Sequence, residues 1–202
     1  MKNRSFTLTL LLGLSLFSSQ LVFADSQTEG KVAYTQGALE FDYDSGIPVN
    51  LNFGDHPLQT VAAENWIATE TGAQTGSTST TGTVAIRDNR GNNEATWTVK
   101  LSQTEQFTAN GTELSGAALN LSFGGVTNNL NLQPTSSYAN GNLEILTFGQ
   151  DYTILDATAG NNSGDSALTI NEFSLDVPAN TKKVAGTYTA TLNWTFSSTP
   201  EN

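Results

Sequence analysis

Apolar and polar residues alternate with a period of two along most of the chain. The clearest run lies near the C-terminus, where Tyr188, Ala190, Leu192, Trp194 and Phe196 alternate with four Thr residues and one Asn. Successive residues of a strand point to opposite faces, so this pattern places one set of side chains in a core and the other in water. The same alternation recurs in residues 39–43, 49–53, 97–101, 119–123 and 173–177.

Turn signals separate these alternating segments. They are Asp44-Ser45-Gly46, Asn110-Gly111, Asn140-Gly141 and the Gly- and Asn-rich residues 88–92 and 160–164. Many short strands with this punctuation predict an all-β fold, an antiparallel β-sandwich or a barrel-like variant, with long loops. The only helix that the pattern allows is a short one near residues 58–67.

Residues 69–83 consist almost entirely of Thr, Gly, Ser, Ala, Gln and Glu. Such a segment has almost nothing to bury, which predicts a mobile loop. The loop either divides two subdomains or lies within one domain, and the chain shows no internal repeat at a fixed spacing.

The N-terminus has the pattern of a secretory signal peptide. Lys2 and Arg4 precede an apolar run over residues 8–16, and Val22-Phe23-Ala24 provides the small residues of a cleavage site. The pattern predicts cleavage after Ala24, with an uncleaved anchor as the alternative. The mature chain, residues 25–202, then suits one domain. At this length its core needs no covalent staples, and without Cys it can form no disulfide. An exported chain without Cys fits a bacterial surface protein better than a small eukaryotic secreted module.

The chain is strongly acidic, with a formal net charge of −11. Without Lys2 and Arg4, six basic residues stand against 19 acidic ones, which leaves −13. Such a chain has no basic patch for phosphates, so we expect neither nucleic-acid binding nor attraction to an anionic membrane. No second apolar segment of membrane length follows Ala24, so we expect no membrane insertion after cleavage. Binding must then hold the protein on the cell.

Residues suited to catalysis or metal binding are few. The lone histidine, His56, could be a general base, but its position before Pro57 indicates a turn residue. One His and no Cys argue against a zinc site. Asp42–Gly46 resembles the start of a calcium loop, but Ile47 and Phe53 stand where an EF-hand needs Gly and Glu. No pair of carboxylates is singled out for glycoside hydrolysis. We therefore expect no catalytic residue, no metal and no cofactor.

The three tryptophans raise a choice between core packing and ligand binding. Aromatic faces can stack on sugars, but Trp97 and Trp194 lie on the apolar sides of their predicted strands, which favours the core. Trp66 lies outside a clear pattern and is a candidate exposed aromatic residue.

Two short motifs, Trp97-Thr98-Val99 and Trp194-Thr195-Phe196, resemble the Trp-x-Leu motif of the WxL domain family of Gram-positive cell-surface proteins. The strongest similarity is in residues 175–196, and residues 51–54, 84–91 and 114–119 are also similar to family segments. Val99 and Phe196 take the place of Leu in the two motifs. Both are apolar strand residues, so an inward orientation is kept.

The resemblance implies non-covalent attachment to peptidoglycan, a membrane-anchored partner protein and membership of multi-protein surface assemblies. It makes Trp97, Val99, Trp194 and Phe196 the motif residues, with a structural or a wall-binding role. Period two turns both motifs inward, so we expect them to lie near each other, on neighbouring or facing strands. The leading hypothesis is a non-enzymatic exported protein that binds peptidoglycan at the cell surface. The alternatives are an assembly subunit whose main ligand is the partner protein, an adhesin for host matrix proteins and a wall hydrolase.

Overall fold

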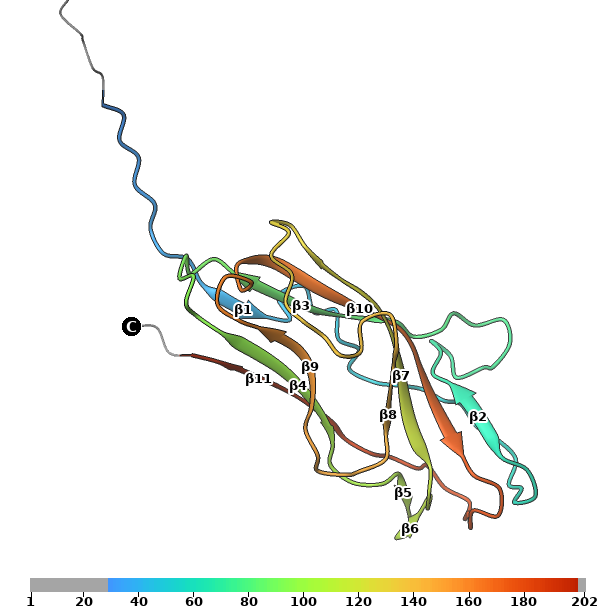
Figure 1. The fold of residues 1–202 in the computed structure, drawn as a ribbon. Helices are drawn as coiled ribbons and strands as arrows, with labels where there is room; N and C mark the ends of the chain where they lie inside the picture. Colours follow the sequence, from blue (N-terminus) through green and yellow to red (C-terminus); the bar gives the residue numbers. More distant parts are fainter. Residues whose placement is uncertain (1–28, 200–202) are drawn as a thin grey trace, which may run out of the picture. The chain divides into compact units, whose positions relative to one another are not determined.

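The computed structural model of the chain describes residues 29–199, so the predicted export signal lies outside the described residues. The chain divides into two units, residues 1–34 and residues 35–202. In the first unit, residues 29–34 are exposed and belong to no strand. All eleven strands belong to the second unit (Figure 1).

The second unit contains three antiparallel sheets. The largest has six strands in the order β1-β3-β10-β7-β8, with β2 paired to the end of β10. Its strands are β1 (Leu39–Phe41), β2 (Glu64–Ile67), β3 (Gly82–Asp88), β7 (Ala118–Asn128), β8 (Asn142–Ile145) and β10 (Gly164–Val177). A three-stranded sheet has the order β11-β4-β9 and consists of β4 (Trp97–Gln103), β9 (Tyr152–Ala157) and β11 (Leu192–Ser198). The third is a small hairpin of β5 (Thr108–Ala109) and β6 (Thr112–Glu113).

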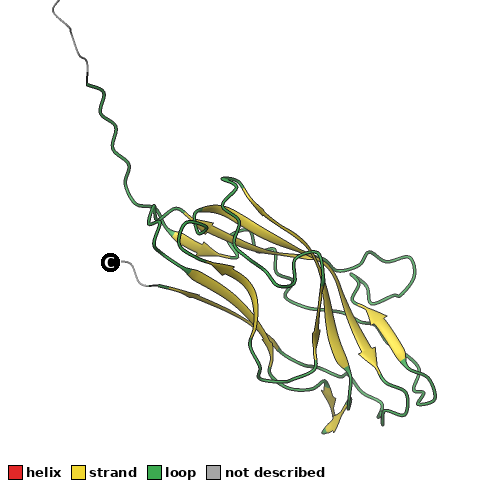
Figure 2. Cartoon of the chain, in the orientation of Figure 1, coloured by secondary structure: helices red, strands yellow, loops and turns green. Residues whose placement is uncertain are grey.

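The two larger sheets pack face to face around one core, as the alternation predicts (Figure 2). Every second residue of β4 is buried, beginning with Trp97, Val99 and Leu101, and these side chains meet the buried side of β10 and β7. Both sheets remain open at their edges. The structure therefore confirms the all-β sandwich, and residues 29–199 contain no helix.

The structure departs from the local pattern in two places. Residues 49–53 form an irregular segment and not a strand, because their carbonyls bond to a loop: the Thr69 N–H donates to Asn52 O (2.9 Å). Val49 is 94% exposed. The short helix near residues 58–67 is also absent. There, the chain first forms a loop and then β2, whose Trp66 pairs with Leu175 of β10. In both cases, pairing with distant segments overrides the local pattern.

The low-complexity residues 69–83 fold back on themselves. Thr69 and Ser79 form an isolated antiparallel bridge. Nearby, the Gln74 side chain accepts a hydrogen bond from Ile67 N–H (2.9 Å) and donates one to Ile67 O (3.0 Å). This amide substitutes for a neighbouring strand at the outer edge of β2. The small polar side chains of residues 69–83 thus form hydrogen bonds with backbone groups instead of filling a core. The mobility of this loop stays a prediction.

A buried ion pair closes the end of β3. The Arg90 guanidinium donates to both carboxylate oxygens of Asp88 (2.7 and 3.0 Å), and each side chain is only 2% exposed. The neighbouring pair of Arg87 with Asp165 (2.9 Å) is far more exposed. Arg90 and Arg87 are three residues apart, so the stability contribution of a buried ion pair can be compared with that of a solvated one.

We predict that Arg90→Met lowers the free energy of unfolding by about 3–5 kcal/mol, because it leaves the Asp88 carboxylate buried without its counter-charge. Arg87→Met is the matched control, and its loss should be much smaller because water already screens that pair. Urea unfolding of both variants measures the difference. Equal losses of unfolding free energy in the two variants would contradict the assignment of Arg90–Asp88 as the buried pair.

Candidate functional site

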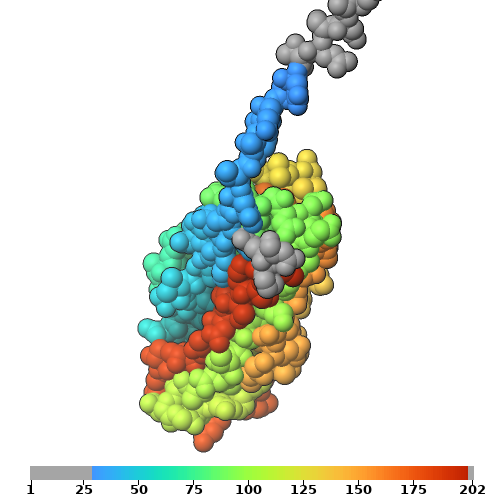
Figure 3. All heavy atoms as spheres, turned by 90° about the vertical axis from the view of Figure 1, so that its left-hand side faces the viewer, coloured from blue at the N-terminus to red at the C-terminus, as the bar shows by residue number. Residues whose placement is uncertain are grey.

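A groove of about 880 Å³ opens on one side of the sandwich. One wall is β11 with the segment before it, residues 183–191, and the other is the irregular segment 48–58. Apolar side chains of the large sheet form its floor, among them Leu119, Phe173 and Leu175. In Figure 3, the C-terminal segment (red) runs along the surface between the blue and cyan N-terminal part of this unit and the green and orange strands.

The first wall presents half-buried aromatic and aliphatic side chains. Tyr188, Leu192 and Trp194 all line the groove and pack against the core from its edge. β11 pairs only with β4 among the described strands, and the sequence from 186 to 199 contains no charged residue. This wall is therefore an uncharged edge strand beside a largely apolar hollow.

The second wall depends on a close backbone approach at Gly54. Gly54 has a φ of +92°, and a Cβ atom there would lie 2.1 Å from the carbonyl oxygen of Gly72. Only glycine fits such a position. This contact holds segment 48–58 against the turn at residues 69–73, which explains the glycine of Leu51-Asn52-Phe53-Gly54 in structural terms.

Trp66 also lines the groove, half-buried, and His56 stacks on it. The two ring centroids are 3.4 Å apart and the rings are nearly parallel, at 7°. His56 Nε2 lies 2.7 Å from Phe53 O, within hydrogen-bond distance. His56 lies in an irregular segment without a regular turn, and it makes a flat aromatic pair with Trp66 in the groove.

A second ion pair joins the first wall to β2. The Lys183 ammonium donates to the Glu64 carboxylate and to Gln59 O (2.9 Å), and both charged side chains are only 9% exposed. Burial by itself raises the pKa of Glu64, but hydrogen bonds from Lys183 and Gln59 and the charge of Lys183 outweigh it. The pKa of Glu64 therefore lies below its ordinary value of 4.5.

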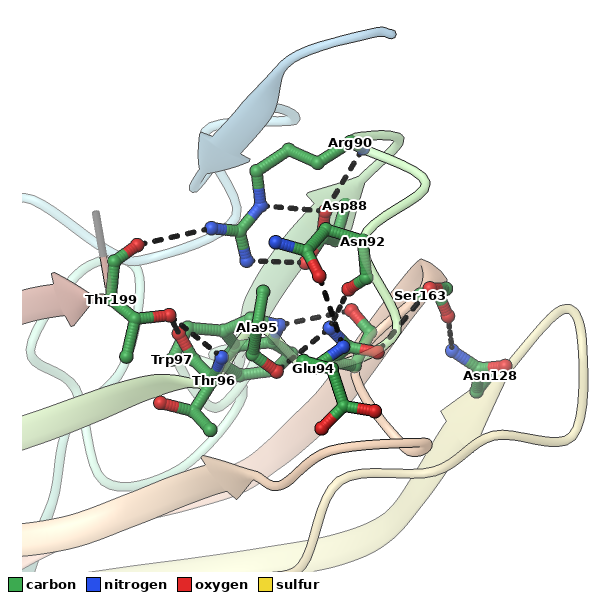
Figure 4. Close-up of polar contacts among 11 residues, drawn as sticks. Asp88, Arg90, Asn92, Glu94, Ala95, Thr96, Trp97, Asn128, Ser163 and Thr199 are labelled. Atoms are coloured by element: carbon green, nitrogen blue, oxygen red, sulfur yellow. Dashed lines mark hydrogen bonds and ion pairs between the residues drawn. The ribbon is translucent and has the colours of Figure 1, made fainter. Parts of the chain in front are cut away.

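Trp97, in contrast, belongs to the core and not to the groove lining. Figure 4 shows the polar contacts around it, with Asn92 and Ala95 of the loop before β4. It is 1% exposed, and its indole N–H donates to Asn162 O (3.1 Å). The Asn162 side chain in turn donates to the carbonyls of Asn92 and Ala95, each at 2.8 Å. The buried indole N–H thus has a partner, and the loop before β4 fixes that partner through Asn92 and Ala95.

The two Trp motifs lie side by side on neighbouring strands, as expected. Phe196 of β11 pairs with Val99 of β4, and the Trp97 and Phe196 ring centroids are 6.4 Å apart. Their burial differs, however. Trp97 and Val99 are fully buried, whereas Trp194 and Phe196 are half-buried at the edge. Only Trp194 of the four lines the groove.

The other candidate residues have structural partners in loops. Asp42 and Asp44 of the calcium-like segment accept backbone hydrogen bonds from Ile47 and Gly46, which makes them turn residues. Within residues 29–199, no group of three or more His, Asp or Glu side chains is placed to hold a metal ion. No helix in this part of the chain has the length and hydropathy needed to cross a membrane.

Sequence reasoning missed most of the groove lining. Tyr188 and Leu192 fit the alternation but seemed to be ordinary core residues, and the Glu64–Lys183 pair has no signal at a separation of 119 residues. The one available signal was the similarity of residues 51–54 to a family segment, because that segment forms a wall.

A family model described as "WxL domain surface cell wall-binding" matches residues 21–200. The match covers nearly the whole sequence, so the chain belongs to the WxL domain family. This is a family of binding domains that attach to the cell wall at the surface, and not an enzyme family. No curated protein and no solved structure gives a significant match.

The different burial of Trp97 and Trp194 predicts different effects on stability. Trp97→Ala removes a fully buried ring and should lower the free energy of unfolding by about 3–5 kcal/mol. Trp194→Ala removes a half-buried ring at an edge, and we expect a smaller loss, within about 0.5–3 kcal/mol. Chemical denaturation of the two variants tests this order, which a greater loss for Trp194→Ala would reverse.

The low pKa of Glu64 predicts a pH-dependent contribution to stability. A carboxyl group whose pKa is lower in the folded state stabilises the fold above its unfolded pKa, and this contribution disappears as the pH falls through the folded pKa. Glu64→Gln should thus be less stable than the parent at pH 7, with a difference that shrinks below pH 4.5. Thermal unfolding from pH 7 to pH 3 measures it. A constant difference over this pH range would contradict the assignment.

Proposed function

We propose that this chain is a non-enzymatic module that binds peptidoglycan in the groove between β11 and residues 48–58. One observation carries the proposal: two of the three tryptophans line a groove of about 880 Å³ in a member of a wall-binding family. We also propose that residues 1–24 direct export and are removed after Ala24, which would place the domain at the cell surface.

The lining suits the mixed chemistry of peptidoglycan. Sugar rings present apolar C–H faces, and Trp194 and the Trp66–His56 stack offer flat aromatic surfaces to them. The apolar floor accepts the methyl groups of a stem peptide. Polar side chains of the lining, such as Asn50 and Thr189, can bond to hydroxyl and amide groups. The volume lies within the range of about 300–1,000 Å³ that is typical of ligand sites.

The groove also explains how an acidic protein can bind an anionic wall. The ammonium of Lys183 is paired with Glu64 at the groove, so neither supplies an isolated charge to the ligand. Contact by stacking and hydrogen bonds depends little on salt, because screening acts mainly on exposed charges. We therefore expect binding to persist in moderate salt.

Trp194→Ala and Trp66→Ala should each bind purified, protein-free peptidoglycan about five- to tenfold more weakly than the parent. The reason is that stacking on an aromatic ring contributes on the order of 1 kcal/mol. The measurement is sedimentation with insoluble peptidoglycan, with melting temperatures taken on the same samples. Trp97→Phe is the control for a ring outside the groove: it loses the N–H bond to Asn162 O and should lower the melting temperature, while the folded protein binds as the parent does.

Two outcomes would contradict the proposal. Trp194→Ala could stay folded and sediment as the parent does, which would place the wall site elsewhere. Alternatively, modest salt could release the parent protein completely, which would make exposed charges the basis of binding.

A second candidate function is that of an assembly subunit with a membrane-anchored partner protein. The observation that favours it is the unpaired, uncharged edge of β11 together with two exposed apolar side chains of the opposite wall, Val49 (94%) and Leu58 (58%). An extended segment of the partner could pair with this edge and place alternate side chains in the groove. Failure to sediment with pure peptidoglycan would make this candidate the leading one.

A further inference from the structure

The outward face of the six-stranded sheet carries a regular array of short polar side chains. Two rows run across β10, β7 and β8, and a third contact joins β2 to β10. The rows are Ser174–Asn120–Glu144, Glu172–Ser122–Asn142 and the pair Asp176–Asn65, each set by strand register. We call these eight side chains the polar array. Neighbouring strands place its members about 5 Å apart, and residues two apart on a strand about 7 Å apart.

The array is hollowed and partly pre-organised. Six of its members line a depression of about 340 Å³. Asp176 is held at both carboxylate oxygens, by the Asn65 side chain (2.6 Å) and the Asn120 side chain (2.9 Å). These bonds fix three side chains in place before any ligand arrives, which lowers the entropic cost of binding.

The remaining side chains of the depression are available to a ligand. They are Ser122, Asn142, Glu172 and Ser174, and their side chains make no hydrogen bond to any residue that the structure describes. Together they offer hydroxyl and amide donors beside a carboxylate acceptor. This set matches a ligand with many closely spaced hydroxyl or amide groups.

The charge of the array narrows the ligand class. It contains three carboxylates, Glu144, Glu172 and Asp176, and neither Lys nor Arg. A phosphate-rich or uronate polymer would meet uncompensated negative charge there, which disfavours its binding. An uncharged or amine-bearing saccharide meets no such penalty. No metal-binding group of three acidic or His side chains exists among the described residues, here or elsewhere.

We infer that the polar array is a second binding site, which holds a hydroxyl-rich, uncharged or amine-bearing saccharide chain laid across β10, β7 and β8. It lies on the opposite face of the sheet from Leu119, Phe173 and Leu175, which form the floor of the groove. The two sites therefore share the same strands but no side chain, and this inference does not depend on what the groove binds.

Titration with chitohexaose, an uncharged N-acetylated sugar oligomer, tests the inference, with poly(glycerol phosphate) as the anionic comparison. The protein purified after export should bind chitohexaose and not the anionic polymer. Asn142→Ala combined with Glu172→Ala removes two array side chains without internal partners. Because the groove is proposed to stack on sugar rings, the titration uses the Trp194→Ala background, where we expect this double variant to bind chitohexaose at least about tenfold more weakly than Trp194→Ala alone, a change of about 1.4 kcal/mol.

Two further variants separate this site from the groove and from misfolding. On the Trp194→Ala background, Ser122→Tyr fills the depression with a residue that suits a strand, and it should abolish chitohexaose binding while the melting temperature holds. Asn193→Ala combined with Thr195→Ala, on outward positions of β11, is the matched control and should bind normally. Trp194→Ala should lose peptidoglycan sedimentation and keep chitohexaose binding.

Three results would overturn the inference. The parent protein could fail to bind chitohexaose, both array variants could bind it as tightly as the parent does, or Trp194→Ala could abolish chitohexaose binding while the array variants retain it. The last result would assign the sugar to the groove and leave the array without a ligand. A failure of peptidoglycan sedimentation alone would remove the proposed function and leave this site standing.

Discussion

Trp97, packed between the two sheets, is the residue on which the rest of the sandwich depends. Its ring fills the space between the two sheets, and its indole N–H needs a partner there, which Asn162 O provides. Because the Asn162 side chain also bonds to the carbonyls of Asn92 and Ala95, the loops before β4 and before β10 are fixed with respect to each other. β11 then pairs with β4, so the position of the first Trp motif sets the register of the second.

The same three-residue pattern therefore produces two different environments. β4 has a neighbour on each side, so its apolar face is closed over by the large sheet. β11 lies at an edge, and the segment opposite it is irregular and held off by the Gly54–Gly72 contact. The sheets diverge there and leave a groove instead of a closed core. Trp97 stabilises the fold, whereas Trp194 is placed where a ligand can reach it.

The large sheet provides two surfaces with different chemistry. Its inner face ends in the apolar floor of the groove, and its outer face carries the polar array. A wall-binding domain with a net charge of −11 cannot rely on general attraction to an anionic wall. The proposed aromatic stacking in the groove and the inferred hydroxyl recognition at the polar array would both act at short range. Two such sites would also let one domain contact two strands of wall polymer, which strengthens attachment through effective concentration.

The sequence by itself determined the fold class, the family and the strands with strict alternation, such as residues 97–101 and 119–123. The reason is that period-two alternation and local motifs are properties of short segments. The sequence could not place residues 49–53 or 58–67, where distant hydrogen bonds outweigh local preference. The array was equally hidden, since its rows arise only from the register of four strands. The burial of each Trp was decided by tertiary structure alone, because alternation shows which way a side chain points but not whether another strand covers it.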